Sequence, residues 1–179
     1  MTRRASSILF LTLFGASLAP AQLAHPPGTP VSILRLLTWD EPMEKDWESF
    51  RSLPIDAAIR VVEMVPQVEA DEDLGSTSRS LVLVRCTTLL ATIQAERSAE
   101  LTATQRASIE QTILHVARLP LEERFVAGVL LSMAKAPTWR YRDFAQSVLS
   151  RPPQEFVLQD TARRMLTAFE ETRSNPIKE

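Results

Sequence analysis

The sequence predicts an all-α fold, and three observations support this prediction. Apolar residues recur three and four positions apart through most of the chain, which is the spacing of an amphipathic helix. Prolines and capping residues stand repeatedly where such segments begin. The strict alternation of apolar and polar residues that indicates a half-buried strand is missing. Because the connections are short, we expect seven or eight helices in stacked antiparallel hairpins, with a compact orthogonal helical bundle as the alternative.

Residues 1–21 have the pattern of a secretory signal peptide and are left out of the fold prediction. Two arginines precede an apolar core at Ile8–Leu18, and small residues ending at Ala21 form a cleavage site. The core is too short for a permanent membrane anchor, which needs about 20 apolar residues. We therefore expect an exported protein, periplasmic or extracellular, with no transmembrane anchor once the signal is removed.

The rest of the chain is expected to form one domain. A Pro-rich leader at 22–39 precedes a single all-helical domain at 40–173, and a disordered tail at 174–179 follows. The start of the leader should have little capacity to pack. After it, Thr29 is predicted to cap a short helix that has Pro30 at its first position. The side chains expected to face inward from this helix are Ile33, Leu34 and Leu37.

Two helices are predicted between the leader and the middle of the chain. Asp40 is expected to cap the first, and Pro54 opens the second, which Pro66 closes. An acidic loop follows at 67–75. The buried face of the first helix is predicted to be Met43, Trp47 and Phe50. The inner face of the second is predicted to be Ile55, Ile59 and Val62.

The longest helix is predicted over 76–96, around the most apolar stretch of the exported chain, and the other helices should pack around it. Its apolar face consists of Val82, Leu83, Cys86, Leu89, Leu90 and Ile93. Its opposite side consists of Leu81, Arg85, Thr88 and Thr92. A strand is the alternative because several residues are β-branched, but the segment lacks strict alternation. Cys86, the single cysteine, excludes an internal disulfide and is expected to be a buried, inert thiol.

Two helices are predicted next. Thr102 and Gln105 form a capping box for the first. Its buried side chains are predicted to be Ala107, Ile109, Ile113 and Val116. Pro120 opens the second, which is apolar on nearly all sides over 125–131 and therefore belongs in the interior. Gly128 lowers helix propensity by about 1 kcal/mol, so it indicates the close approach of a neighbouring helix.

The last two helices each have one apolar face. Pro137 opens the first of them, and Pro152-Pro153 ends it. Its inner residues are predicted to be Tyr141, Phe144, Ala145 and Val148. The stripe of the final helix is predicted to be Leu158, Ala162, Met165 and Phe169.

A spacing of 33 and 66 residues suggests an internal repeat. Leu53-Pro54 is matched 66 positions later by Leu119-Pro120, and Pro153 lies 33 positions beyond that proline. Helical-hairpin solenoids have units of this size, although proline followed by an acid is also a general helix start. In this layout, most of the mature chain resembles HEAT-like α-helical hairpin repeat proteins, and the resemblance implies an α-α superhelix.

No metal, cofactor or catalytic site is predicted. His25 lies in the leader and His115 is expected to face solvent, whereas zinc needs three or four converging ligands. A calcium loop of the EF-hand type beginning at Asp71 would need Gly and Glu where Ser76 and Val82 stand, so we expect a solvated acidic loop. The sequence also has no Gly-rich phosphate loop, and no Ser-His-Asp set forms unless the second histidine turns inward.

Two short motifs carry further family resemblances. Glu48-Ser49 is similar to the Glu-Ser pair of lytic transglycosylases, which implies a cell-wall enzyme with this Glu as general acid. The Gly- and Gln-rich segments of that family are missing, and the Glu is expected on the outer face of its helix. Segment 101–105 has the LTxxQ form seen in periplasmic stress chaperones of the Spy and CpxP type, which implies a dimeric cradle for unfolded clients. That motif normally occurs twice, and it is also physically a capping box.

The charge distribution carries the remaining functional content. Asp40–Asp73 has eleven acidic residues against three basic ones, a net charge of −8, and Arg118–Arg164 has eight basic against five acidic, a net charge of +3. The whole chain, at −2, lacks the basic excess of a nucleic-acid binder. The charged segments are either solvated faces or a surface for an anionic partner or head-to-tail contact around Trp139, Arg140 and Arg142, since Trp and Arg anchor interfaces.

The sequence thus predicts an exported, non-catalytic protein-interaction or scaffolding module whose partner is another protein. A periplasmic chaperone or envelope stress-response binder is the alternative, and a cell-wall-active enzyme comes third. The residues predicted to bind the partner are Trp139, Arg140 and Arg142.

Overall fold

The computed structural model describes residues 23–39, 42–150 and 156–174, and every regular element within these ranges is helical. Eight helices of at least eight residues and one single-turn helix confirm the predicted all-α fold for this part of the chain. None of the described helices is long and apolar enough to cross a membrane. The predicted signal peptide lies outside the described residues, so export stays a prediction.

The helices follow one another with short connections. The first five are α1 (Val31–Thr38), α2 (Glu44–Arg51), α3 (Ile55–Ala58), α4 (Val61–Ala70) and α5 (Ser76–Glu96). After a 3-10 turn, η2 (Ser98–Glu100), come α6 (Ala103–Arg118), α7 (Glu123–Met133), α8 (Trp139–Leu149) and α9 (Phe156–Ser174).

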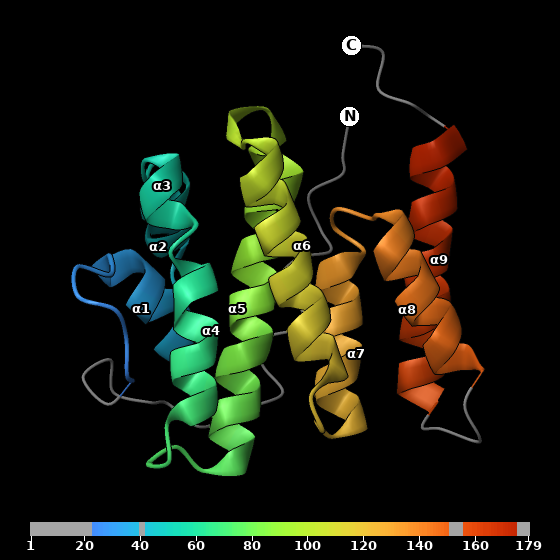
Figure 1. The fold of residues 1–179 in the computed structure, drawn as a ribbon, viewed down its shortest axis with the longest axis horizontal. Coiled ribbons are helices and arrows are strands. Elements are labelled where there is room, and N and C mark those ends of the chain that lie inside the picture. The colour runs from blue at the N-terminus through green and yellow to red at the C-terminus, as the bar shows by residue number, and fades with distance from the viewer. Residues whose placement is uncertain (1–22, 40–41, 151–155, 175–179) are drawn as a thin grey trace.

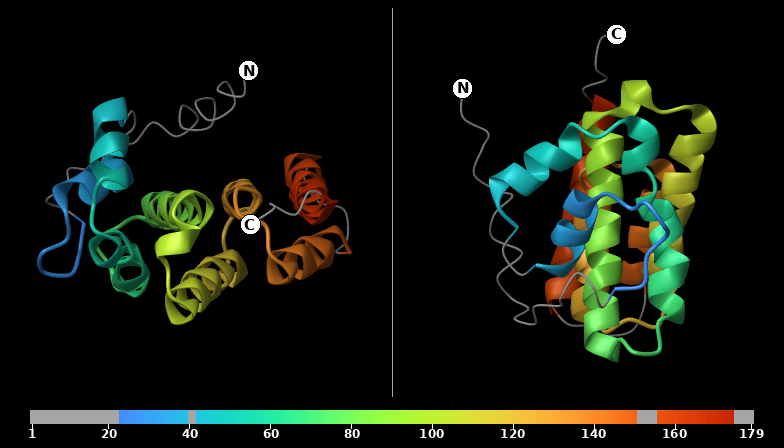
Figure 2. Two further views of the ribbon diagram at one scale, coloured as in Figure 1. Left: turned by 90° about the horizontal axis from the view of Figure 1, so that it is seen from above. Right: turned by 90° about the vertical axis from the view of Figure 1, so that its left-hand side faces the viewer.

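The longer helices form antiparallel hairpins that stack side by side (Figure 1). The pairs are α4 with α5, α6 with α7, and α8 with α9. Seen from above, α5, α7 and α9 lie in one layer and α4, α6 and α8 in the other, while α1 and α2 pack at the α5 end of the stack (Figure 2). This arrangement is the stacked array of hairpins that the sequence predicts, and not the orthogonal bundle.

The 33- and 66-residue spacing gains no support from this arrangement. Leu53-Pro54 leads into the single-turn helix α3, which precedes the first helix of a hairpin. Leu119-Pro120 leads into α7, which is the second helix of its hairpin. Pro153 lies outside the described residues. The two segments therefore occupy different structural positions, and each is simply a helix start.

Helix α5 covers the predicted residues and is the centre of the stack. The predicted apolar face is confirmed, with an exposed fraction of 2% or less for Val82, Leu83, Cys86, Leu89, Leu90 and Ile93. The opposite side is also covered, because α1, α4, α6 and α7 all contact this helix. Arg85 is 5% exposed and its Nη1 donates a hydrogen bond to the carbonyl oxygen of Leu37 at 2.8 Å. The periodicity predicted the helix but not the number of its neighbours.

The interior helix predicted around 125–131 is α7, and its contact with α5 requires Gly128. A Cβ atom at this glycine would lie 2.8 Å from Cγ1 of Val84 on α5, closer than carbon atoms pack. The same two helices are joined by a hydrogen bond, because Oγ of Ser132 lies 3.0 Å from Oγ1 of Thr88. The predicted close approach of a neighbouring helix is therefore confirmed.

The capping predictions have two outcomes. At the start of α6 the capping box is formed: Gln105 N–H donates to Thr102 Oγ1 at 3.2 Å, and Thr102 N–H donates to Gln105 Oε1 at 2.9 Å. At the start of α1 the prediction is wrong. Thr29 does not cap the helix, because its hydroxyl donates instead to the carbonyl oxygen of Pro26 at 2.7 Å and closes a turn in the leader.

The start of the leader packs, contrary to the prediction. Leu23 is 3% exposed and belongs to the same core as the helices, and Pro26 is buried. Nη2 of Arg60 donates to the carbonyl oxygen of Pro27 at 2.8 Å. This contact joins segments 33 residues apart, so composition alone could not reveal it.

Three further residues differ from the prediction. Met43 is 48% exposed because it precedes α2, and Asp46 is buried in that helix, where it accepts a hydrogen bond from the Met43 N–H at 3.1 Å. Pro66 does not end its helix; it lies exposed inside α4, which loses one backbone hydrogen bond there and continues to Ala70. Ala107 is exposed on α6. Asp40 lies outside the described residues.

The other predicted inner faces are confirmed, with Trp47 and Phe169 partly buried. They are Ile33, Leu34, Leu37, Phe50, Ile109, Ile113, Val116, Tyr141, Phe144, Ala145, Val148, Leu158, Ala162 and Met165. Ile55, Ile59 and Val62 are partly buried and pack against this core.

Candidate functional site

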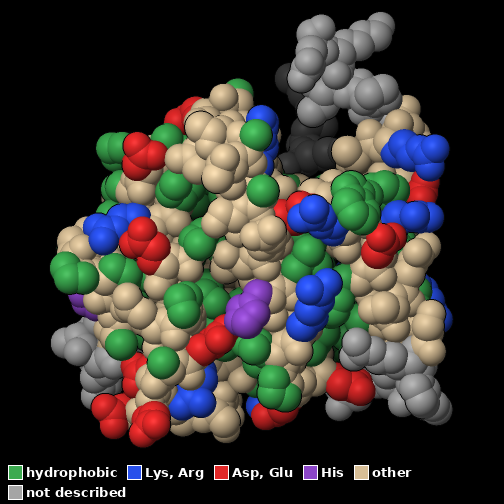
Figure 3. All heavy atoms as spheres, viewed as in Figure 1, with side chains coloured by type: hydrophobic (Ala, Val, Ile, Leu, Met, Phe, Trp, Pro, Cys, Tyr) green, Lys and Arg blue, Asp and Glu red, His purple; other side chains and the backbone are tan. Residues whose placement is uncertain are grey.

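Helix α6 lies between α4 and α8 in the outer layer, and a shallow groove runs along each side of it. The α6–α8 groove has a volume of about 390 Å³, and its lining residues are Leu114, Arg118, Trp139, Arg140, Asp143, Phe144 and Ser147. The α4–α6 groove has a volume of about 270 Å³, and its polar lining residues are Asp56, Arg60, Glu63, Thr104, Gln105 and Ser108. In the space-filling view of this face, Lys and Arg side chains are more frequent over the right-hand half, which holds α6 to α9 (Figure 3).

Trp139 is the first residue of α8 and projects from the protein. Its exposed fraction is 61%, high for an aromatic side chain. The guanidinium carbon of Arg140 lies 5.2 Å from the centroid of the indole ring, which is a cation–π contact. An apolar ring and a cation are thus presented together at the rim of the α6–α8 groove.

Contacts from Glu110 of α6 hold this end of α8 in place. Nη1 of Arg140 lies 3.4 Å from Glu110 Oε2, and the hydroxyl of Thr138 donates to Glu110 Oε1. The same hydroxyl caps α8 by accepting the backbone N–H of Tyr141 at 3.4 Å. The backbone that carries Trp139 is therefore fixed although its ring is exposed.

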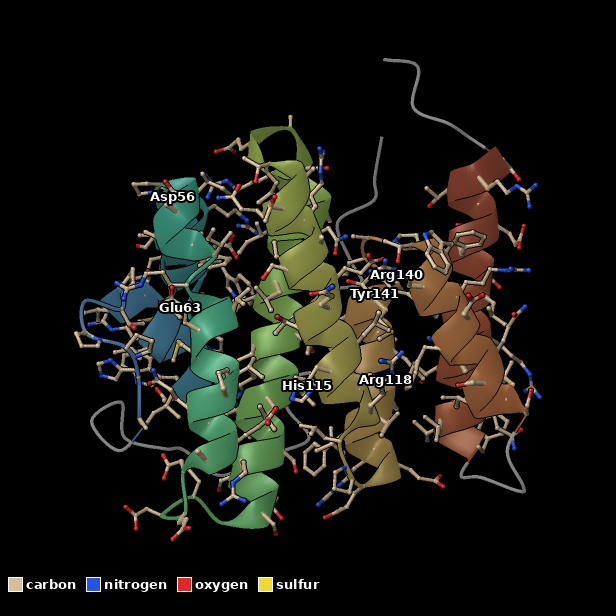
Figure 4. All side chains as sticks on the ribbon, viewed as in Figure 1. Asp56, Glu63, His115, Arg118, Arg140 and Tyr141 are labelled. Atoms are coloured by element: carbon tan, nitrogen blue, oxygen red, sulfur yellow. The ribbon has the colours of Figure 1, made fainter. Side chains whose placement is uncertain are left out.

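Arg118 supplies the second cation of the groove. It is exposed in the last turn of α6, where a positive charge is favoured by the helix dipole. Among the described residues, no acid lies within ion-pair distance of its guanidinium. Figure 4 places Arg118 and Arg140 on the same side of α6. Against the one acid of the lining, Asp143, these two cations give the α6–α8 groove a net charge of +1.

Arg142 does not belong to this site, so the predicted trio is divided. Its guanidinium lies 5.6 Å from the ring centroid of Phe169 on α9. Its Nε lies 4.0 Å from a carboxylate oxygen of Glu170, and its Nη1 lies 3.9 Å from one of Asp143. Side chains on one face of a helix lie three or four positions apart, so these three residues, which fall within four consecutive positions, do not all share a face. Arg142 covers α9 instead.

Tyr141 points into the core, as predicted. It is fully buried, and its hydroxyl donates a hydrogen bond to Oε1 of Gln94 on α5 at 3.1 Å. Burial raises the pKa of Tyr141 well above its usual range, and the negative charge of Glu110 adds to the rise. The residue secures α8 to α5 and stays neutral at every physiological pH.

The α4–α6 groove has the opposite character. Oδ1 of Asp56 accepts a hydrogen bond from Gln105 Nε2 at 3.0 Å, and its carboxylate lies at the rim. The Glu63 side chain is 59% exposed, and its Oε2 lies 3.4 Å from Nε of Arg60. The apolar part of the lining is Ile59, Val62 and Ile109.

The remaining reactive side chains do not converge. His115 faces solvent as predicted, and its Nε2 lies 2.6 Å from Oε1 of Glu69, which joins α6 to α4. Burial raises the pKa of Cys86 to about 12, so a thiolate nucleophile does not form at neutral pH. Glu48 is exposed on α2 and lines neither groove. Among the described residues, no group of three or more His, Cys, Asp or Glu is placed to hold a metal ion.

Sequence reasoning therefore found Trp139 and Arg140 but missed Arg118, the anchoring Glu110 and the entire acidic groove. Arg118 had two sequence signals, its place at the end of a predicted helix and its membership of the basic segment Arg118–Arg164, but neither singles it out among the cations of that segment. The sequence shows the acidic excess before residue 73, but it does not show that some of these acids lie beside α6. Comparisons with known protein families, with curated proteins and with solved structures find no match for the chain.

Proposed function

We propose that this chain is an exported, non-catalytic protein-interaction module that binds an acidic segment of a partner protein in the α6–α8 groove. The observation that carries the proposal is the exposed ring of Trp139, stacked on Arg140 beside Arg118, which has no acid as a partner among the described residues. Trp and Arg are the residue types on which protein interfaces most often depend.

The chemistry of the groove indicates the kind of segment. Arg118 has no internal partner among the described residues, so a bound carboxylate would not have to displace one. Arg140 is already paired with Glu110, but its guanidinium has five N–H donors and can donate to a second carboxylate. Leu114 and Phe144 line the groove and offer apolar contact. A segment that combines acids with one or two apolar side chains fits this lining.

Fluorescence polarisation with a labelled peptide rich in Glu and Leu tests the proposal. The control is a peptide of the same length in which Lys replaces each Glu. Arg118→Glu combined with Arg140→Glu should weaken binding of the Glu peptide by about tenfold or more, because attraction becomes repulsion. The control variant Arg163→Glu with Arg173→Glu, which carries the same charge change on the far helix, should leave binding unchanged. The affinity should also fall as salt rises, since exposed charges are screened.

Unaltered binding by the Arg118/Arg140 variant, with an unchanged helical circular dichroism spectrum, would remove the proposal. A second assay on the same preparation distinguishes the chaperone alternative from the proposed function. This assay measures whether the protein suppresses the aggregation of an unfolded client. The capping box at Thr102 accounts for the LTxxQ motif without any client. Cell-wall activity is tested by turbidity clearing of a peptidoglycan suspension, which Glu48→Gln would abolish.

A further inference from the structure

We infer that two copies of this chain associate face to face around α6, with Trp139 and Arg140 of each copy entering the acidic α4–α6 groove of the other. The inference shares the α6–α8 groove with the proposed function but rests on the arrangement of both grooves, and not on binding of a third protein.

The two grooves lie on one face and on opposite sides of one helix. Figure 4 shows Asp56 and Glu63 on one side of α6, and Arg118 and Arg140 on the other. A half-turn about an axis parallel to α6 exchanges these two sides. Two copies related by that rotation therefore set each acidic groove against the basic groove of the partner, and the same contact occurs twice.

The projecting Trp139 ring and the α4–α6 groove also have complementary shapes. Trp139 is a single projecting aromatic ring fixed by the contacts of Glu110, whereas the α4–α6 groove is a hollow of about 270 Å³ with apolar residues in its lining. An exposed ring inserted into such a hollow loses contact with water, which is favourable at about 25 cal/mol per Å². The cation stacked on the ring would then lie near the carboxylates of Asp56 and Glu63, whose only internal partners are Gln105 and Arg60 among the described residues.

The size of the face is adequate for a stable pair. Helix α6 has 16 residues, which gives a length of about 24 Å. Helices α4 and α6 contact each other, and Glu110 joins α6 to Arg140 and Thr138 at the start of α8, so the three helices form one continuous face that is wider than two packed helices about 8–10 Å apart. A face of these dimensions approaches the roughly 800 Å² per partner that standard interfaces bury.

A face-to-face pair also differs from the head-to-tail contact that the sequence suggested. Head-to-tail contact joins two different surfaces and leaves one of each unsatisfied, so it grows into open filaments unless it closes into a ring. A pair around a two-fold axis satisfies both grooves of both copies and stops at two. The position of the two grooves on one face favours the closed pair.

Two reversed variants test the inference by sedimentation velocity. The acid-reversed variant carries Asp56→Lys and Glu63→Lys, and the base-reversed variant carries Arg118→Glu and Arg140→Glu. The unaltered protein should be a dimer at about 100 μM, and each variant alone a monomer, because like charges then face each other. An equimolar mixture of the two variants should form heterodimers, because both contacts regain opposite charges.

Matched controls carry the same charge changes away from the face. Glu48→Lys with Glu171→Lys and Arg163→Glu with Arg173→Glu should remain dimers. Trp139→Ala keeps every charge and should weaken the dimer by about tenfold or more. Arg118→Glu alone breaks no internal contact among the described residues, so this variant should fold normally. It should still weaken the dimer, and it therefore tests the inference even if the double variant folds poorly.

A protein that is monomeric at about 100 μM overturns the inference, as does a dimer that persists in both reversed variants. So does the absence of heterodimers from a mixture in which both variants keep their helical circular dichroism. Failure of the proposed function looks different, because it is a loss of peptide binding. The acid-reversed monomer, which has a free α6–α8 groove, should still bind the Glu peptide if the proposed function is right, whether or not the unaltered protein dimerises.

Discussion

The interior helices α5 and α7 and the outward faces of α6 and α8 belong to one stack of hairpins, yet different constraints fix their side chains. On α5 and α7 nearly every position has a neighbour, and even the polar residues Arg85, Thr87 and Ser132 are buried and hydrogen-bonded. On the outward faces, Arg118 and Trp139 project into solvent. Side chains of the first kind are determined by packing, whereas side chains of the second kind are exposed and are the ones available to another molecule.

Truncation of an interior side chain gives the largest expected effect on stability. Leu90 on α5 is fully buried, so Leu90→Ala removes apolar contact and leaves a cavity. The free energy of unfolding should fall by about 2–5 kcal/mol, measured by urea denaturation. A loss below about 1 kcal/mol would show that the interior is loosely packed and would remove the contrast between the two regions.

The next largest effect concerns the contact between the two interior helices. Gly128→Ala places a methyl group 2.8 Å from Cγ1 of Val84, whose branched side chain has little freedom to move. Overpacking of this kind costs about 1–3 kcal/mol, and the gain in helix propensity offsets up to about 1 kcal/mol of it. We expect net destabilisation in a urea titration.

A double-mutant cycle isolates this contact. In a Val84→Ala background the space is free, so Gly128→Ala should become neutral or stabilising, and the coupling between the two sites should be favourable. If Gly128→Ala stabilises the otherwise unaltered protein, the two helices are not as close as the structure shows.

The interior was the part of the fold that the sequence could predict. Its apolar residues repeat with the helical period, and glycine in an apolar helix has few explanations other than close packing. The errors have two sources, one a contact between segments distant in sequence and the other a local choice at the end of a helix. Leu23 packs because Arg60 and the helices hold the leader in place. The Thr29 hydroxyl donates to the nearby carbonyl oxygen of Pro26, and its oxygen accepts no N–H from the start of α1.

The candidate site was only half predictable, for a related reason. Trp139 and Arg140 are adjacent in sequence, so their residue types alone indicated an interface. Arg142 has the same residue type, but the turn of the helix directs it to Phe169 and Glu170 on α9. A groove is formed by two helices. The periodicity of apolar residues shows which face of each helix is buried, but it does not show which two helices will lie side by side.

The interior also predicts a pH dependence, through Cys86 on α5. Burial raises the pKa of this thiol from an ordinary value of 9.0 to about 12. The folded protein therefore holds the proton more tightly than the unfolded chain, so the stabilisation is complete below pH 9 and is lost as pH rises from 9 towards 12. The loss should reach about 1.4 kcal/mol per pH unit in this interval.

Cys86→Ala separates this effect from other groups that titrate in the same range in the unfolded chain, such as Tyr141, whose ordinary pKa is about 10. Denaturation profiles of both proteins between about pH 8 and 10.5 should diverge, with the steeper decline in the protein that keeps the thiol. Parallel profiles would mean that the thiol reaches water in the folded state, in which case a thiol reagent would also label it without denaturant.

The smallest expected effect on stability is on the outward face, at Trp139. Because the ring is 61% exposed, Trp139→Ala should change the free energy of unfolding by no more than about 0.5 kcal/mol. Val148→Ala on the same helix, where the side chain is 1% exposed, is the matched interior control and should be clearly destabilising. The same Trp139→Ala variant should lose peptide binding and self-association by about tenfold or more. A large effect on unfolding with intact binding would reverse the assignment, because it would mean that the ring serves the fold of α8 and not a partner.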